Sequence, residues 1–398
     1  MSTINPSSKN ELESGLTSPS PSTKEKKIAA AQSDEARTSL SSFKQLGFLD
    51  RFLAIWIFLA MALGIILGYF VPETGPALQK GEFAEVSIPI AIGLLVMMYP
   101  ILCKVRYETL HRLLRLRALW IQVVFSIFVN WVVAPLLMVA LSWAFLPDRS
   151  ELREGLIIVG IARCIAMVLI WTELASGDSD YCAMLVAINS FLQIILFAPM
   201  AVFYINVVSR SKSSIEISYS TVAVSVAVFL GIPLGAAIIT RLALLKLIFK
   251  GDVDKYNRNF IRWISPWSLI GLLFTILILF ASQSRNIVSK ITSVLRVSAP
   301  LIVYFVIIFS ATLAACRYFG NGKFAGGKLG HWGYGITVTQ ALTAASNNFE
   351  LAIAVAVACY GAGSEQALAA TVGPLIEVPV LLGLVELVKF LKSRWNWK

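Results

Sequence analysis

The sequence predicts an all-α integral membrane protein with about ten transmembrane helices. Of its 398 residues, 57% are hydrophobic and only 14% are charged, and the mean hydropathy is +0.75. A soluble domain of this length needs far more charge than that. Apolar runs of about 20 residues recur along most of the chain, and each is long enough to cross roughly 30 Å of hydrocarbon.

The N-terminal segment differs from the rest of the chain. Residues 1–45 are rich in Ser, Thr, Pro, Lys and Glu and contain no apolar run, which predicts a disordered cytoplasmic tail. Since no apolar segment lies near Met1, no cleaved signal peptide is expected. The ten-helix domain is expected over residues 46–398.

Ten apolar segments are the expected spans, and several contain an internal proline, which removes a backbone donor and bends or opens a helix. The loops that would face the cytoplasm with an inside N-terminus carry more Lys and Arg than the alternate loops, so both termini are predicted to be cytoplasmic. That orientation requires an even number of spans. The expected spans are residues 48–70, 86–104, 118–146, 153–174, 181–208, 219–245, 262–281, 297–319, 333–360 and 366–391.

A faint internal repeat relates the two halves of the membrane domain. Short motifs recur in the same order and at similar offsets, namely residues 63–68 and 230–235, 92–95 and 270–273, and 198–199 and 378–379. We therefore predict two repeats, one over about 48–208 and the other over about 219–391. Because each holds an odd number of spans, the repeats would be inverted, which is typical of transporters with a substrate site near the bilayer midplane.

Several classes of function are disfavoured by residue usage. The net charge of +11 is spread over short segments between apolar runs, which favours contact with the lipid bilayer over binding of nucleic acid. The five cysteines form no CxxC pair and the two histidines lie in or beside loops, so we expect no metal centre and no cofactor. The alternative from another class is a membrane-embedded enzyme, which is disfavoured because the spans hold no Ser/His/Asp, His-rich or Asp-rich constellation.

A charged or strongly polar side chain inside a span costs about 2.5–3.5 kcal/mol or more on insertion scales, so such residues indicate function. Arg163 and Cys164 lie in the middle of the fourth span. A thiolate is a soft ligand that prefers thiophilic metals and metalloids, and the guanidinium is a counter-charge for it. The alternative is that Cys164 is a small core residue and that Arg163 only bridges backbone carbonyls.

The ninth span contains Asn347, Asn348 and Glu350. Paired asparagines favour a helix break, because their side chains compete with backbone hydrogen bonds. We expect Asn347 and Glu350 to share one helical face, and Glu350 to exchange a proton. As an alternative, Glu350 is a structural partner of Arg163 that never titrates.

In the tenth span, Glu377 lies between Pro374 and Pro379, in a stretch that is not expected to be regular helix throughout. Three roles are open for Glu377: it could carry protons, pair with Arg163, or cap a broken helix end. In the fifth span, Asn189 and Gln193 share a face and are expected to line a cavity, although hydrogen bonding between helices is the commoner role of such groups. The other four cysteines are interpreted as packing residues.

These stretches resemble the arsenite permease family of the arsenical-resistance systems, within the bile acid/arsenite/riboflavin transporter superfamily. The resemblance runs from about Leu49 to Lys389, and its most specific parts are residues 162–171, 346–350 and 373–379. It implies two inverted five-helix repeats whose fourth and ninth helices are broken and cross at the centre. It also implies efflux of arsenite, often also antimonite, driven by proton entry.

The resemblance implies that Cys164 is essential, as the ligand of the metalloid As(III), and that Glu350 serves proton coupling. The expected substrate-binding residues are Cys164, Arg163, Asn189, Asn347, Asn348 and Glu350, and the expected proton-coupling residues are Glu350 and Glu377. The membrane is expected to be the plasma membrane, with a vacuolar membrane as the alternative. The nearest alternative function is a sodium-coupled organic anion carrier of the same superfamily.

Overall fold

The computed structural model describes residues 52–71, 73–78, 80–105, 107, 117–165, 167–210, 217–321, 332–395 and 397. The chain divides between Gln45 and Leu46 into two units, and every described residue belongs to the second. The disordered tail predicted for residues 1–45 lies outside the described residues. Two short strands, β1 (Glu82–Phe83) and β2 (Val86–Ser87), pair antiparallel.

Helices occupy all ten ranges that the sequence predicts as spans, and several include π-helical turns (η). In chain order they are α3 (Leu53–Phe70), α4 (Thr74–Leu78), α5 (Ile88–Lys104), α7 (Arg117–Phe128), η1 (Val129–Val133), α8 (Ala134–Phe145), α9 (Ser150–Ile161), α10 (Met167–Leu174), α11 (Ser179–Val202), η2 (Phe203–Val208), α12 (Tyr219–Val226), η3 (Ala227–Gly231), α13 (Ile232–Ala243), η4 (Leu244–Ile248), α14 (Val253–Tyr256), η5 (Asn257–Ile261), α15 (Arg262–Ser289), α16 (Ile291–Asn321), α17 (Tyr334–Ala345), α18 (Phe349–Tyr360) and α19 (Glu365–Trp395).

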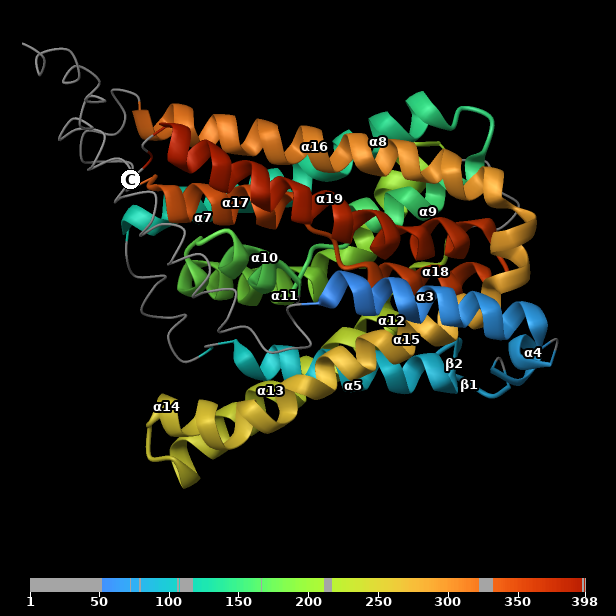
Figure 1. The fold of residues 1–398 in the computed structure, drawn as a ribbon, viewed down its shortest axis with the longest axis horizontal. Coiled ribbons are helices and arrows are strands. Elements are labelled where there is room, and N and C mark those ends of the chain that lie inside the picture. Colours follow the sequence, from blue (N-terminus) through green and yellow to red (C-terminus); the bar gives the residue numbers. More distant parts are fainter. Residues whose placement is uncertain are drawn as a thin grey trace, which may run out of the picture. The chain divides into compact units, whose positions relative to one another are not determined.

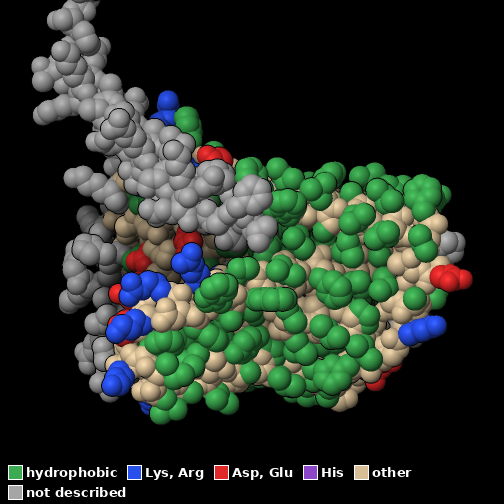
Figure 2. Space-filling model, turned by 60° about the horizontal axis from the view of Figure 1, so that its bottom comes forward, with side chains coloured by type: hydrophobic (Ala, Val, Ile, Leu, Met, Phe, Trp, Pro, Cys, Tyr) green, Lys and Arg blue, Asp and Glu red, His purple; other side chains and the backbone are tan. Residues whose placement is uncertain are grey.

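The described helices have the length and composition of membrane spans. Six are long and apolar enough to cross a bilayer: Trp120–Phe145, Ser179–Val208, Tyr219–Ile248, Val253–Arg285, Ile291–Gly320 and Glu365–Trp395. Shorter apolar helices cover Ile55–Phe70, Ile88–Lys104 and Phe349–Tyr360. Figure 2 shows hydrophobic side chains over most of the displayed face, with Lys and Arg gathered mainly toward one end. The predicted all-α membrane fold is confirmed, while the inverted repeat of ten helices stays a prediction.

The helices pack in two groups (Figure 1). In one group, α15 packs against α3 and α5, and α13 packs against α5; in the other, α8, α9, α16, α17, α18 and α19 pack against one another. Glycine permits the closest approach in the first group. A Cβ atom at Gly68 of α3 would lie 2.0 Å from the backbone oxygen of Ala281 in α15, so any larger residue would force these two helices apart.

Internal prolines distort some helices without ending them. The π-helical turns η1 and η3 end two residues before Pro135 and Pro233, and their wider turn leaves room for a ring that lacks a backbone donor. The expectation of irregular backbone between Pro374 and Pro379 is wrong, because α19 runs unbroken past both. Each proline removes only one hydrogen bond, and α9, α16 and α18 pack along α19 and hold it as one helix.

Candidate functional site

Two broken helices cross in the middle of the second group. Helix α9 ends at Ile161 and α10 begins at Met167, while α17 ends at Ala345 and α18 begins at Phe349. Between these ends, Arg163 and Asn347 form an antiparallel bridge, and the backbone N–H of Asn348 donates to the oxygen of Ala162 at 3.0 Å. Figure 1 shows α9 and α18 on one side of this point, with α10 and α17 on the other. The predicted break and crossing of the fourth and ninth spans is confirmed.

The two asparagines of the ninth span hold the crossing together. The Oδ1 atom of Asn348 accepts from the N–H of Leu351 at 3.1 Å and so caps the first turn of α18. The Nδ2 atom of Asn347 donates to the oxygen of Val159 at 2.6 Å and to that of Ala162 at 3.3 Å. These carbonyls lie at the C-terminal end of α9, where a helix has no backbone donors of its own.

Because Asn347 lies in the break between α17 and α18, it does not share a helical face with Glu350. That expectation is wrong. The spacing rule on which it rested holds only where the backbone is a continuous helix.

Arg163 is fully buried and bridges both broken helices. Its guanidinium donates to the backbone oxygen of Gly160, to that of Ala344 at 3.5 Å, and to the hydroxyl of Tyr304 at 3.2 Å. Its backbone N–H donates to Oε1 of Gln193 at 2.5 Å. Gly160 and Ala344 lie at the C-terminal ends of α9 and α17, whose partial negative charge a guanidinium stabilises. This matches the alternative in which Arg163 bridges backbone carbonyls.

Glu377 of α19 reaches the crossing from the side. Its Oε1 accepts from the backbone N–H of Asn347 at 3.2 Å, and it interacts electrostatically with both Glu350 and Arg163. Glu350 lies in the first turn of α18 and is 9% exposed, and Glu377 is 3% exposed. Neither carboxylate lies within ion-pair distance of Arg163. The crossing therefore gathers two buried carboxyl groups near one guanidinium that is bound to backbone oxygens.

Cys164 lies next to the bridge on the α9–α10 side. It is 2% exposed, and the antiparallel register places it opposite Ser346. Asn189 of α11 is 3% exposed, and its Oδ1 accepts from the indole N–H of Trp131 at 3.2 Å. Cys164 and Glu350 therefore both lie within a few residues of the same crossing.

Several buried polar atoms of this region have no hydrogen-bond partner within the described part of the protein. Such atoms are rare in folded proteins, because a buried donor or acceptor without a partner is costly. They are the Oγ of Ser346, the Oδ1 of Asn347 and the nitrogens of Arg163 (Nε), Trp171 (Nε1), Asn189 (Nδ2), Gln193 (Nε2) and Asn348 (Nδ2).

Sequence reasoning missed some buried polar groups. Tyr304, which is fully buried and bonds Arg163, sits in an ordinary aromatic-rich span and gives no local signal. Glu154 is 1% exposed and accepts from Nε2 of Gln366 at 3.0 Å, although its place near a span end suggests exposure. Arg241 is 1% exposed and donates to the oxygen of Cys103 at 3.0 Å, which caps α5. Only the tertiary contacts show that these groups are inside.

Several apolar helices and a buried polar crossing of two broken helices define a multi-pass membrane transport protein. The comparisons with known proteins agree. Residues 91–290 match the model of the Sodium Bile acid symporter family. The chain belongs to this family, and the predicted resemblance to its arsenite permeases is confirmed by the relatives.

Three relatives cover most of the chain. An arsenical-resistance protein Acr3 from Corynebacterium glutamicum is 45% identical over 345 residues, which span 86% of this chain and 89% of the relative. An uncharacterised transporter from Synechocystis is 33% identical over 363 residues, 86% of this chain and 89% of the relative. A second Acr3, from Alkaliphilus metalliredigens, is 29% identical over 355 residues, 86% of this chain and 93% of the relative.

Proposed function

We propose that this protein expels arsenite in exchange for protons, with antimonite as a further candidate substrate. The observation that carries the proposal is the crossing itself, where Cys164 and Glu350 approach one buried polar site. The 45% identity to an arsenical-resistance protein supports the choice of substrate. We place the protein in the plasma membrane with both termini in the cytoplasm, and a vacuolar membrane is the alternative.

The proposed chemistry suits an uncharged substrate. Arsenite at neutral pH is mainly As(OH)3, which offers hydroxyl groups to the polar atoms of Asn189, Asn347 and Asn348. The thiol of Cys164 displaces one hydroxyl: an S–As bond forms, an As–O bond breaks, and the thiol proton leaves with the hydroxyl as water. A single sulfur ligand gives a complex that water can reverse, whereas three thiols would hold arsenic too tightly for release.

The carboxyl groups supply the proposed coupling. The guanidinium of Arg163 is always charged, so Arg163, Glu350 and Glu377 have no net charge when one carboxyl holds a proton. Without that proton the group of three is negative, which is costly at this depth. Protonation of Glu350 from outside would weaken the loaded state, and loss of the proton to the cytoplasm would reset it. Rocking of one helix group against the other would provide alternating access.

The coupling role is tested by Glu350→Gln in inverted membrane vesicles. Arsenite uptake should lose its dependence on an imposed proton gradient, because glutamine keeps the shape of the side chain but exchanges no proton. Full gradient-driven uptake by this variant would show that Glu350 does not couple transport to protons.

The ligand role is tested by Cys164→Ser, with Cys316→Ser as the matched control. Both thiols are buried, but Cys316 lies in α16, away from the crossing. Arsenite transport should fall at least about tenfold in the first variant, which equals about 1.4 kcal/mol of lost stabilisation, and stay normal in the second. Equal transport by the two variants would rule out the thiol.

A sodium-coupled organic anion carrier is the second candidate, because the matching family model describes sodium symporters. The two functions differ in their driving ion. Replacing sodium by choline should leave arsenite transport unchanged, and bile acids should not compete. Transport that stops without sodium would favour this second candidate.

A further inference from the structure

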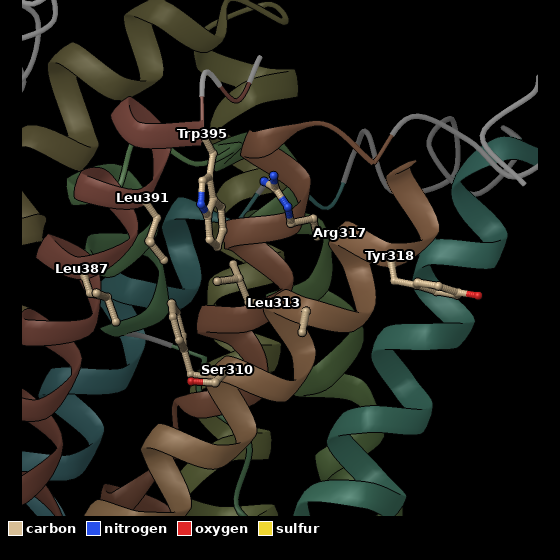
Figure 3. A pocket seen from close by; sticks show the side chains of 9 residues that line it. Ser310, Leu313, Arg317, Tyr318, Leu387, Leu391 and Trp395 are labelled. Carbon is tan, nitrogen blue, oxygen red and sulfur yellow. The ribbon is translucent and has the colours of Figure 1, made fainter. Parts of the chain in front are cut away.

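We propose that a groove between α16 and α19 binds an anionic phospholipid, with Arg317 holding the phosphate. The groove has a volume of about 490 Å³ and lies between the C-terminal parts of these two helices (Figure 3). It is separate from the crossing, and the proposal does not depend on which substrate is transported.

The lining of the groove is apolar along most of its length. Its floor is formed by Phe309 and Leu313, which are buried, and its walls include Leu387 and Leu391. Figure 3 shows Leu387 and Leu391 of α19 on one side, with Ser310 and Leu313 of α16 on the other. Leu387 is 44% exposed, so the groove opens toward the surroundings of the helices. Apolar surface of this kind suits an acyl chain.

A cation lies at the end of the groove. The guanidinium of Arg317 is 4.1 Å from the ring centre of Trp395 and 4.6 Å from that of Trp397. In Figure 3, Arg317 and Trp395 approach each other, whereas Tyr318 points away. Stacking uses the faces of a guanidinium and leaves its N–H edge to other acceptors. Within the described residues, Arg317 forms no ion pair and no hydrogen bond.

The dimensions match one leaflet of a bilayer. Arg317 lies four residues before the end of α16, which places it near the helix end. From Arg317 to Ser310 the groove follows two turns of helix, or roughly 10 Å at 1.5 Å per residue, within the roughly 15 Å hydrocarbon depth of one leaflet. Tryptophan and tyrosine also favour the boundary between headgroups and hydrocarbon. The cation therefore lies where a phosphate would be, and the apolar groove lies below it.

The charge at this end favours a lipid with net negative charge. Lys389 pairs with Glu386 at 2.9 Å, and Lys392 lies 4.6 Å from the ring centre of Tyr334, while Arg394 is exposed. A zwitterionic headgroup would add a second cation beside Arg317, whereas phosphatidylglycerol adds none. Basic sites between membrane helices are typical places for anionic headgroups.

The test is native mass spectrometry of the full-length protein in detergent, titrated with dioleoyl phosphatidylglycerol or dioleoyl phosphatidylcholine. The first phosphatidylglycerol should bind tighter than phosphatidylcholine. Arg317→Gln should weaken that first binding about fivefold, Arg317→Lys should retain most of it, and Arg394→Gln, a control at the same end, should not change it.

Three results would overturn the proposal. One is equal binding of phosphatidylglycerol by wild type and Arg317→Gln. Another is displacement of the lipid by soluble glycerophosphoglycerol alone, which would indicate a site for a free anion. The third is a change of oligomeric state in Arg317→Gln with unchanged lipid binding, which would indicate that a second copy occupies the groove. The quantity compared is the ratio of phosphatidylglycerol binding to phosphatidylcholine binding, and both are measured on the same folded sample. A loss of stability in Arg317→Gln therefore does not affect the comparison.

Discussion

The substitution Asn347→Leu should destabilise the protein, because it leaves the backbone oxygen of Val159 without a hydrogen-bond donor. In an unbroken helix, the oxygen of Val159 would accept from the N–H of Arg163, but that N–H donates to Gln193. The side chain of Asn347, 2.6 Å away, donates to Val159 in its place. The other acceptor of Asn347, the oxygen of Ala162, keeps a bond from Asn348. Leucine has the branched shape of asparagine and no donor, so the substitution removes the hydrogen bond, and its larger methyl group cannot approach the oxygen to 2.6 Å, which adds to the loss.

The expected magnitude follows from the burial of that oxygen. A buried acceptor left without a partner costs about 1–3 kcal/mol. At about 2 °C per kcal/mol for a protein of this size, the midpoint of thermal unfolding should fall by roughly 2–6 °C. The assay is intrinsic tryptophan fluorescence of the purified protein in detergent during a temperature ramp.

Thr343→Val is the matched control. The hydroxyl of Thr343 is also buried and donates to the oxygen of Thr339 at 2.7 Å. That oxygen lies inside α17 and keeps its backbone donor, so the control should change the midpoint by less than about 2 °C. The reasoning would be refuted if the unfolding midpoint of Asn347→Leu lay within about 1 °C of the wild-type midpoint. It would also be refuted if the midpoint fell equally in both variants.

Two further predictions concern packing and a buried carboxyl group. Gly68→Ala should destabilise by at least about 1–3 kcal/mol, because the new Cβ would meet the backbone oxygen of Ala281, and thermal unfolding checks this. Gly235→Ala, at the equivalent position of the echoed motif, meets nothing within 4 Å and should be neutral or slightly stabilising; an equal loss in both would contradict the prediction. Glu154→Leu should cost about 1–3 kcal/mol, because Nε2 of Gln366 loses its acceptor. Glu154→Gln retains an acceptor and should unfold near the wild-type temperature, and a large fall there would show that the charge itself is needed.

The sequence indicated which charged residues would be buried inside the helix bundle, because a charge is costly in hydrocarbon. Arg163, Glu350 and Glu377 are charged groups within apolar runs, and the structure buries all three near one crossing. The paired asparagines predicted a helix break, because their side chains satisfy backbone groups that a helix would otherwise satisfy itself. These are local properties of side chains, so they can be deduced without coordinates.

Prediction was weaker where the outcome depended on neighbouring helices. Two prolines predicted irregular backbone around Glu377, yet packing holds α19 as one helix. Tyr304 bonds Arg163 from a helix 141 residues away along the chain. Glu154 lies near a span end and is nevertheless 1% exposed. None of these outcomes has a local sequence pattern that would indicate it.

The local sequence therefore determined that this protein lies in a membrane, where its spans lie, and that the ninth span breaks, whereas the break in the fourth span was expected only from the family resemblance. It did so because hydropathy and the need to satisfy backbone donors and acceptors act over one or two helical turns. The tertiary structure confirmed the crossing of the two breaks that the family resemblance implied, and it alone decided that Asn347 bonds the end of α9 and that Arg163 binds backbone oxygens rather than a carboxylate. The contacts of Asn347 and Arg163 depend on which helices lie side by side. That arrangement is set by the packing of the whole domain and not by any local segment of the sequence.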